Sequence, residues 1–289
     1  MSKSFGGQNM FHPLRRVLVK RPDAAFAVED SDRWHYVASP DLETAQQEHD
    51  SMVETLRQAG AEVLYHEELQ PDRADAIYVF DPILLTDHGA VVLSMGKDLR
   101  RGEEEALARR LGELGIPTLF SLEGEARAEG GDLLWLDETT LAAGIGFRTN
   151  LEGVWQLRAG LEPLGIEVLA FELPYFTGPE ACLHLLSLIS ILDHDLAVVY
   201  PPLIPVPFWQ ELEARGFQLV VVPEEEFATM GTNVLALGPR TCLVLEGNPV
   251  TRRRLEESGC RVSSYRGNEI SLKCEGGPTC LTRPLLRQA

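Results

Sequence analysis

The segment Gly165-Ile166-Glu167-Val168 directly follows an amphipathic stretch over residues 150–164. Glycine just past a helix is the usual left-handed terminator, and the apolar run after it is typical of a strand. The same succession of helix, glycine and strand occurs four more times, at Gly60, Gly115, Gly216 and Gly259. Recurrence at a spacing of roughly 50 residues indicates a repeated structural unit.

Between these helices, pairs of apolar runs are joined by turn residues. The pattern predicts hairpins over residues 77–94, 132–145, 183–200 and 234–245. A fifth hairpin would use residues 271–273 and 281–285, with residues 17–20 supplying another strand. The unit is therefore hairpin, helix and strand. Five such α/β units arranged radially would leave a central channel, as in propellers. Nothing resembles a linker, so we expect one closed domain over residues 1–289.

A polar residue stands near the start of the first strand of each predicted hairpin. If the units are related by rotation, these side chains point into one central cavity. They are Asp75 and Asp81 in the first hairpin, Glu129 and Asp132 in the second, His184 in the third and Asn233 in the fourth, with Cys280 in the last unit.

The segment Glu275-Gly276-Gly277-Pro278-Thr279-Cys280 predicts a tight, closely approached turn that holds a thiol at the mouth of a cavity. A cysteine nucleophile needs activation, and His184 is the candidate acid–base partner. Glu129 would orient His184, as the third member of a triad does, and Asp81 would hold a cationic substrate. Each residue alone also has a structural interpretation: an inert thiol, a hydrogen-bonded core histidine, or a carboxylate that initiates a turn.

The net charge and the cysteine content of the chain limit the kinds of ligand and partner that it is expected to bind. The net charge of −18 opposes binding to nucleic acid and favours small cations. Five cysteines without a C-x-x-C spacing favour free thiols in a reducing compartment, and we expect no metal site or cofactor. Cys182 and Cys242 lie among apolar residues and are expected in the core. No secretory signal or membrane-spanning stretch is evident, so the expected location is the cytoplasm, away from the membrane.

In this order and at these separations, the motifs resemble those of the guanidino-group-modifying enzymes of the pentein fold, and in particular the dimethylarginine dimethylaminohydrolases. The resemblance covers nearly the whole chain from about Arg15. The motifs are residues 75–82 with two substrate-binding acids, 100–103 with a basic motif, 129–132 with the glutamate, 147–150 with a second carboxylate-binding motif, 183–185 with the histidine, and 276–280 with the nucleophile.

The resemblance implies a five-bladed α/β propeller with pseudo-fivefold repeats around a central active-site channel. It implies that Cys280 attacks a guanidinium carbon held by Asp81, and that His184 protonates the departing amine. Hydrolysis of the resulting thiouronium would give a ureido product such as citrulline. Asp75 would be the other substrate-binding acid of its segment. Arg100 and Arg148 would bind the substrate carboxylate.

Three positions depart from the relatives. Phe80, in the predicted substrate site, stands where dimethylarginine-hydrolysing relatives carry an acid that contacts the guanidino group. Leu186 replaces the aspartate of arginine deiminases and amidinotransferases, and Thr279 replaces the histidine that usually precedes the deiminase nucleophile. The substituent on the guanidine therefore stays open.

The favoured function is a cofactor-free hydrolase of arginine or an N-substituted arginine. The alternatives are an arginine deiminase-like or amidinotransferase activity, and a ribosome-binding factor of the same fold, which the cysteine and the acidic charge disfavour. Expected partners are a small cationic guanidino compound and, as one option, a second copy of the chain in a homodimer. The glycine-rich residues 5–10, within a segment over 1–14, are expected to fold over the site as a lid.

Overall fold

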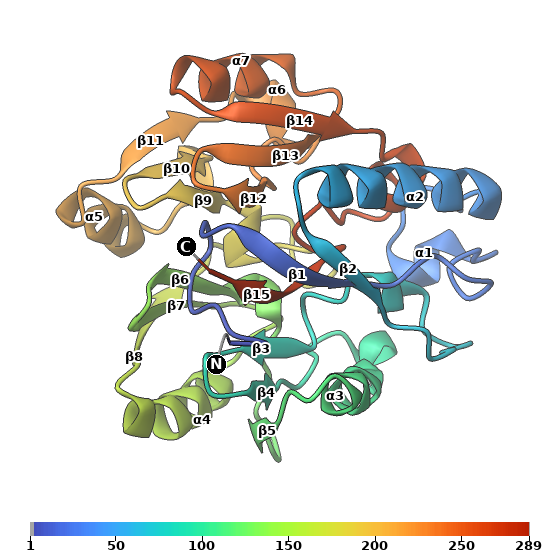
Figure 1. Ribbon diagram of the computed structural model, residues 1–289, viewed down its shortest axis with the longest axis horizontal. Helices are drawn as coiled ribbons and strands as arrows, with labels where there is room; N and C mark the ends of the chain where they lie inside the picture. Colours follow the sequence, from blue (N-terminus) through green and yellow to red (C-terminus); the bar gives the residue numbers. More distant parts are fainter. Residues whose placement is uncertain (1–2, 289) are drawn as a thin grey trace.

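In the computed structural model, which describes residues 3–288, five small sheets stand around a common centre (Figure 1). The strands are β1 Leu14–Val19, β2 Glu62–Tyr65, β3 Ile83–Leu85, β4 Ala90–Val92, β5 Thr118–Ser121, β6 Leu133–Asp137, β7 Thr140–Ile145, β8 Glu167–Glu172, β9 Ile189–Asp193, β10 Leu196–Val199, β11 Gln218–Val221, β12 Leu235–Gly238, β13 Thr241–Leu245, β14 Arg261–Tyr265 and β15 Arg283–Arg287. The α-helices are α1 Ser31–Trp34, α2 Leu42–Gln58, α3 Glu103–Glu113, α4 Leu151–Leu161, α5 Val206–Ala214, α6 Glu224–Phe227 and α7 Pro249–Glu257.

Every sheet has the same internal order. The sheets are β15-β1-β2, β3-β4-β5, β6-β7-β8, β9-β10-β11 and β12-β13-β14. In each one the first two strands are antiparallel, and the third is parallel to the second. A helix crosses over between the two parallel strands and lies on the outer rim (Figure 1). The predicted five-bladed α/β propeller is therefore confirmed.

The glycines after the crossover helices have the backbone conformation that the repeat predicts. The φ angles of Gly60, Gly115, Gly165, Gly216 and Gly259 are 92°, 76°, 74°, 77° and 85°. Only glycine adopts this left-handed region without strain, so each helix ends there and the chain turns back into the third strand. A left-handed glycine after the crossover helix is therefore the local feature that recurs in every blade.

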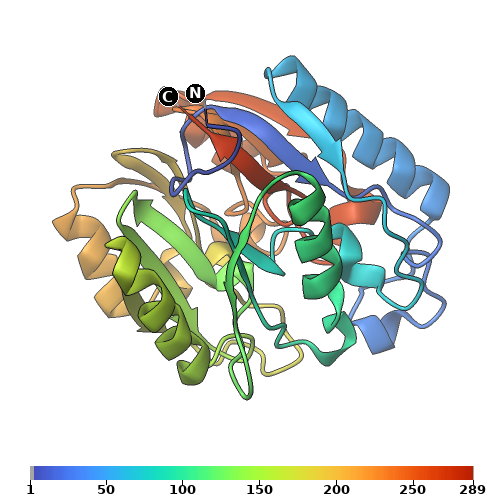
Figure 2. The same ribbon diagram turned by 60° about the horizontal axis from the view of Figure 1, so that its bottom comes forward.

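The predicted fifth hairpin is wrong in one strand. Residues 271–273 lie at the end of a single π-helical turn over Asn268–Leu272, not in a strand. The Glu48 carboxylate on α2 accepts hydrogen bonds from the N–H groups of Asn268, Glu269 and Ile270, which holds this segment as a helical turn. Instead, β15 pairs antiparallel with β1, and the two chain ends close one blade (Figure 2).

The N-terminal segment does not cover the polar starts of the blades. Gly7 N–H donates to Asp87 at 2.8 Å, and the Gln8 amide donates to the Glu138 carbonyl at 2.6 Å. Both acceptors lie in hairpin turns, at the end of the propeller opposite to Cys280. Residues 3–14 therefore do not form the expected lid over the cysteine, and Met1 and Ser2 of that prediction lie outside the described residues.

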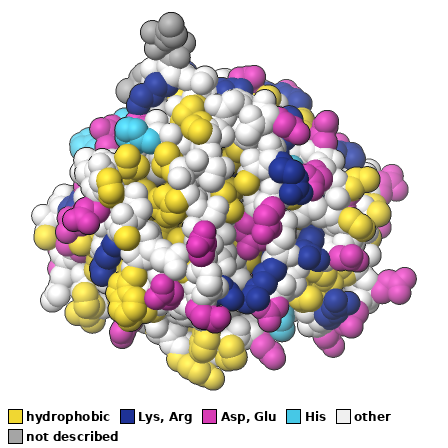
Figure 3. Space-filling model, turned by 90° about the horizontal axis from the view of Figure 1, so that it is seen from below, with side chains coloured by type: hydrophobic (Ala, Val, Ile, Leu, Met, Phe, Trp, Pro, Cys, Tyr) yellow, Lys and Arg dark blue, Asp and Glu magenta, His cyan; other side chains and the backbone are white. Residues whose placement is uncertain are grey.

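No helix within residues 3–288 is both long and apolar enough to span a membrane. On the face in Figure 3, acidic and basic side chains are interspersed, with several hydrophobic side chains exposed between them.

Two helical glycines test how tightly the blades pack. A Cβ at Gly153 in α4 would lie 2.1 Å from the Arg127 carbonyl oxygen, whereas one at Gly112 in α3 would meet nothing within 4 Å. Gly153→Ala should therefore lower the free energy of unfolding by about 1–3 kcal/mol. Gly112→Ala should raise it by about 0.5–1 kcal/mol because alanine favours a helix. Urea unfolding measures both, and equal effects of the two substitutions would contradict this packing.

Candidate active site

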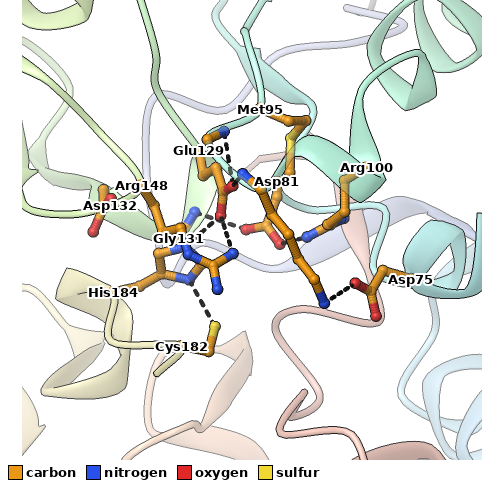
Figure 4. A network of polar contacts seen from close by, with 12 residues as sticks. Asp75, Asp81, Met95, Arg100, Glu129, Gly131, Asp132, Arg148, Cys182 and His184 are labelled. Carbon is orange, nitrogen blue, oxygen red and sulfur yellow. Dashed lines mark hydrogen bonds and ion pairs between the residues drawn. The ribbon is translucent and has the colours of Figure 1, made fainter. Parts of the chain in front are cut away.

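A cavity of about 270 Å³ opens at the end of the channel where the first strands of the blades begin. The segments before β3, β6, β9, β12 and β15 all reach it, so residues far apart in sequence meet there. Its lining includes the predicted Asp75, Phe80, Asp81, Arg100, Arg148, His184, Asn233 and Cys280. Glu129 and Asp132 lie behind this lining and are fully buried. The predicted convergence therefore occurs, with two carboxylates in a supporting position (Figure 4).

The turn before Cys280 depends on close packing. A Cβ at Gly276 would lie 2.0 Å from the Tyr78 ring, and one at Gly277 would lie 2.3 Å from the Asn233 side chain. Neither glycine has a positive φ; the left-handed residue is Glu275, with φ 58°. The predicted close approach is present, but the left-handed step stands one residue earlier than the glycines. Any side chain at either glycine would displace the segment that carries the thiol.

The Cys280 thiol is held in its protonated form. Enclosure of the sulfur raises its pKa to about 11, and the Asp81 carboxylate adds to this effect. Asn233 Nδ2 donates to the sulfur at 3.3 Å and, with His184, acts in the opposite direction. Without a bound cation, this thiol is therefore neutral at physiological pH.

His184 and Glu129 form a buried ion pair. His184 Nε2 lies 2.7 Å from Glu129 Oε2, and the other carboxylate oxygen accepts the N–H groups of Gly96 and Lys97, both at 2.9 Å (Figure 4). Burial disfavours the imidazolium, but the Cys182 sulfur, Asp132 and Glu129 outweigh it and hold the His184 pKa well above its usual value. Burial likewise opposes ionisation of Glu129, yet His184 and Arg148 keep its pKa low. The pair is therefore charged at neutral pH.

The His184 ring is held in place by contact with Gly131 and by hydrogen bonds of the backbone around His184. A Cβ at Gly131 would lie 2.3 Å from His184 Nδ1, so the ring rests on that glycine. Asp132 accepts the Leu185 N–H at 3.0 Å, and His184 N–H donates to Ser187 Oγ at 3.1 Å. With Nε2 committed to Glu129, Nδ1 is the nitrogen left for proton transfer.

Cys182 corrects one expectation from the sequence. It lines the cavity instead of packing in the core, and its sulfur lies 3.8 Å from His184 Nδ1 (Figure 4). Cys242 is fully buried, as expected. An apolar sequence context did not distinguish a side chain beside the histidine from one inside a blade.

Arg100 makes more hydrogen bonds to other protein groups than the sequence indicates. Its guanidinium donates to Asp81 at 2.6 Å, to Glu103 at 2.8 and 3.0 Å, and to the Tyr78 carbonyl at 2.9 Å. Asp81 also accepts the Gly131 N–H at 2.9 Å. Arg100 therefore holds the Asp81 carboxylate in place and offers little to a second anion.

Lys97 is a cavity residue that the sequence analysis missed. Its ammonium donates to Asp75 at 2.6 Å and to the Trp34 carbonyl at 2.8 Å, and Tyr36 also donates to Asp75 at 2.6 Å. The only signal was a cation in the segment after the second strand of a hairpin, three residues before Arg100. Asp75 is therefore already neutralised by a neighbour.

Among the Lys and Arg side chains that line the cavity, Arg148 makes the fewest hydrogen bonds and ion pairs to other protein groups. Its guanidinium lies 3.7 Å from Glu129, and within residues 3–288 its side chain makes no hydrogen bond to another protein group. It is 7% exposed and faces the cavity. An arginine in this state can bind a carboxylate with both arms of its fork.

The one candidate metal cluster within the described residues lies elsewhere. Asp193, His194 and Asp195 meet in a hairpin turn at the other end of the propeller. Arg240 already pairs with the two carboxylates at 2.9 and 2.6 Å, so the cluster has its own cation.

Comparisons with known proteins point to one group of enzymes. The family model for eukaryotic N,N-dimethylarginine dimethylhydrolases matches residues 31–287. A dimethylarginine dimethylaminohydrolase from Streptomyces coelicolor is 30% identical over 275 residues, which cover 93% of this chain and 96% of that protein.

Two solved structures share the fold. DDAH from Pseudomonas aeruginosa, a cysteine-to-serine mutant complexed with citrulline, has a TM-score of 0.77 at 22% identity, covering 93% of this chain and 98% of its own. An amidinotransferase from Microseira wollei, of the saxitoxin biosynthetic pathway, has a TM-score of 0.80 at 17% identity, with 99% and 98% covered. The fold is therefore that of the penteins.

The protonated state of the thiol can be tested by alkylation. Because the Cys280 pKa lies at about 11, its reaction with iodoacetamide should be slow at pH 7. The rate should then rise about tenfold for each pH unit as the thiolate fraction grows. Tandem mass spectrometry that distinguishes the label on Cys280 from the label on Cys274 in the same peptide follows this cysteine, and Cys280→Ser identifies its signal. A rate that levels off below pH 9 would contradict a neutral resting thiol.

Proposed function

The chain belongs to the dimethylarginine dimethylaminohydrolase family of the penteins, and on that premise we propose that it hydrolyses the guanidino group of an N-substituted arginine. The observation that carries the proposal is the meeting of three groups in one cavity. These are a thiol at Cys280, a charged His184 whose Nδ1 contacts the Cys182 sulfur and not Glu129, and the Asp81 carboxylate fixed by Arg100. Together they supply a nucleophile, a proton donor and a counter-ion for a guanidinium.

The first step begins when the substrate cation enters beside Asp81. A cation close to Cys280 lowers the thiol pKa, so the proton leaves to solvent and the thiolate attacks the guanidinium carbon. A carbon–sulfur bond forms and a tetrahedral adduct results. The carbon–nitrogen bond to the amine then breaks as His184 Nδ1 donates its proton to the departing nitrogen. A thiouronium remains on the sulfur.

In the second step the same histidine accepts a proton instead of donating one. His184 is neutral after its donation, and it accepts a proton from a water that attacks the thiouronium carbon. The carbon–sulfur bond of this adduct then breaks, the hydroxyl proton passes to the departing sulfur and restores the neutral Cys280 thiol, and the ureido product departs. Glu129 stabilises the imidazolium at the beginning and end of the cycle, since it holds Nε2 throughout.

The cavity lining favours a substituted guanidine. Phe80 and Leu186 line the cavity beside Asp81, where an acid would otherwise accept further N–H groups. An N–H that faces these side chains would be desolvated without a partner, whereas a methyl group would lose nothing. We therefore assign N-methylated arginine as the preferred class. Arg148, in place of a pair of arginines, is the group that binds the substrate carboxylate.

Product analysis over a set of guanidines tests this function. Citrulline should form from monomethyl- or asymmetric dimethylarginine faster than from arginine, and Cys280→Ser should lose at least about 10³-fold in kcat/KM. Release of citrulline from arginine alone would move the activity to that of a deiminase. Formation of a guanidino product from added glycine, without citrulline, would establish an amidinotransferase instead.

The role of Arg148 is tested with agmatine, which has the guanidine but no carboxylate. Arg148→Gln should lower kcat/KM for methylated arginine by about 10- to 100-fold through loss of charge-assisted hydrogen bonds. With agmatine the same substitution should have little effect, and Arg148→Lys should recover part of the loss. An equal decrease for both substrates would mean that Arg148 acts through Glu129 and His184 rather than on the carboxylate.

A further inference from the structure

The central channel continues behind the candidate active site into a second, smaller cavity of about 30 Å³. Phe80, Leu186 and Thr279 line both cavities and separate them. At its far end the small cavity is lined by Gly7, Asn9 and Met10 of the N-terminal segment. It is therefore an internal space within the propeller.

Two arginines of β15 line this internal cavity. Arg283 is 4% exposed and Arg287 is 7% exposed. Arg283 Nη1 donates to the Ile83 carbonyl at 2.8 Å, and Arg287 donates to the carbonyls of His12 and Ala236, both at 2.8 Å. Arg283 Nε is buried and has no partner among residues 3–288. One face of the Arg283 guanidinium rests on the Phe80 ring, 3.6 Å from its centroid.

These two cations differ from the other buried cations in one respect. Lys20, Arg100 and Arg148 each have a carboxylate within 4 Å, at 3.3, 2.6 and 3.7 Å. No carboxylate in residues 3–288 lies within 4 Å of Arg283 or Arg287. Burial lowers the pKa of both guanidinium groups to about 9, and Arg287 adds to this effect at Arg283.

A buried cation without a counter-ion is strongly unfavourable, and two in one cavity are more so. Asp81, the one carboxylate whose charge reaches Arg283, is already bonded to Arg100 and to Gly131. The volume suits a single ion or a water and excludes a guanidino compound. We propose that this cavity binds a small monovalent anion, such as chloride, between Arg283 and Arg287.

The anion would offset one of the two positive charges of the guanidinium groups directly behind Phe80 and Thr279, and would reduce the repulsion between them. It would thereby stabilise the wall that separates the two cavities, independently of whether the chain hydrolyses guanidines. A ligand that binds only the folded protein raises its thermal stability with concentration.

Halide-dependent melting tests the site. With ionic strength held constant by sodium gluconate, replacing gluconate by chloride or bromide should raise Tm by about 3 °C for each tenfold increase above the dissociation constant. Arg283→Met should remove this dependence, and without halide it should melt at or above the wild-type temperature because a buried unpaired charge is lost. Arg266→Met, at an arginine that is exposed on the surface, should keep the full halide effect.

A direct measurement keeps the proposal testable if Arg283→Met fails to fold. Crystals of the wild-type protein grown in bromide should show an anomalous peak between the two guanidinium groups. A Tm that does not change with halide, together with water alone at that position, would overturn the proposal. A halide effect of equal size in Arg283→Met would also overturn it.

Discussion

The fully buried carboxylate of Glu129 is the contact on which the rest of the site depends. It precedes β6, yet it accepts the backbone N–H groups of Gly96 and Lys97, which follow β4, and it pairs with His184, which precedes β9. One side chain thus joins three blades. A buried ion pair is tolerated only when its remaining hydrogen bonds are satisfied, and here the backbone supplies them. The negative charge to which the proposed mechanism assigns a role is therefore also a structural contact between blades.

The radial arrangement explains how a small chain assembles such a site. Each blade contributes the residues before its first strand, so the acid, the base and the thiol come from separate segments and meet at the axis. Each of these segments is short and is anchored by a strand immediately after it. Their relative positions are fixed by the close packing between blades. Arg100, which follows β4 of the same blade, likewise fixes the Asp81 carboxylate through a hydrogen-bonded ion pair.

Sequence reasoning succeeded where the signal is local and failed where it is not. The glycines after the helices could be identified because a left-handed terminator has a short-range cause. The strands at residues 281–285 and 17–20 were expected in the last unit and correspond to β15 and β1, but the expected strand at residues 271–273 is a helical turn, because Glu48 from a distant part of the sequence binds its backbone. The engagement of Arg100 by Asp81, and the place of Cys182 beside His184, depend on which side chains meet in space. Family motifs identified residues that meet at one cavity, but not which of them were already bonded to each other.

The closure of one blade by the two ends of the chain has a consequence during biosynthesis. Cys280 lies just before β15, and β15 pairs with β1 from the other end of the sequence. During synthesis, β1 therefore keeps one edge unpaired until β15 has emerged from the ribosome. A nascent chain thus has four complete blades at most and no positioned thiol. The enclosure that raises the Cys280 pKa is therefore complete only once β15 has paired with β1.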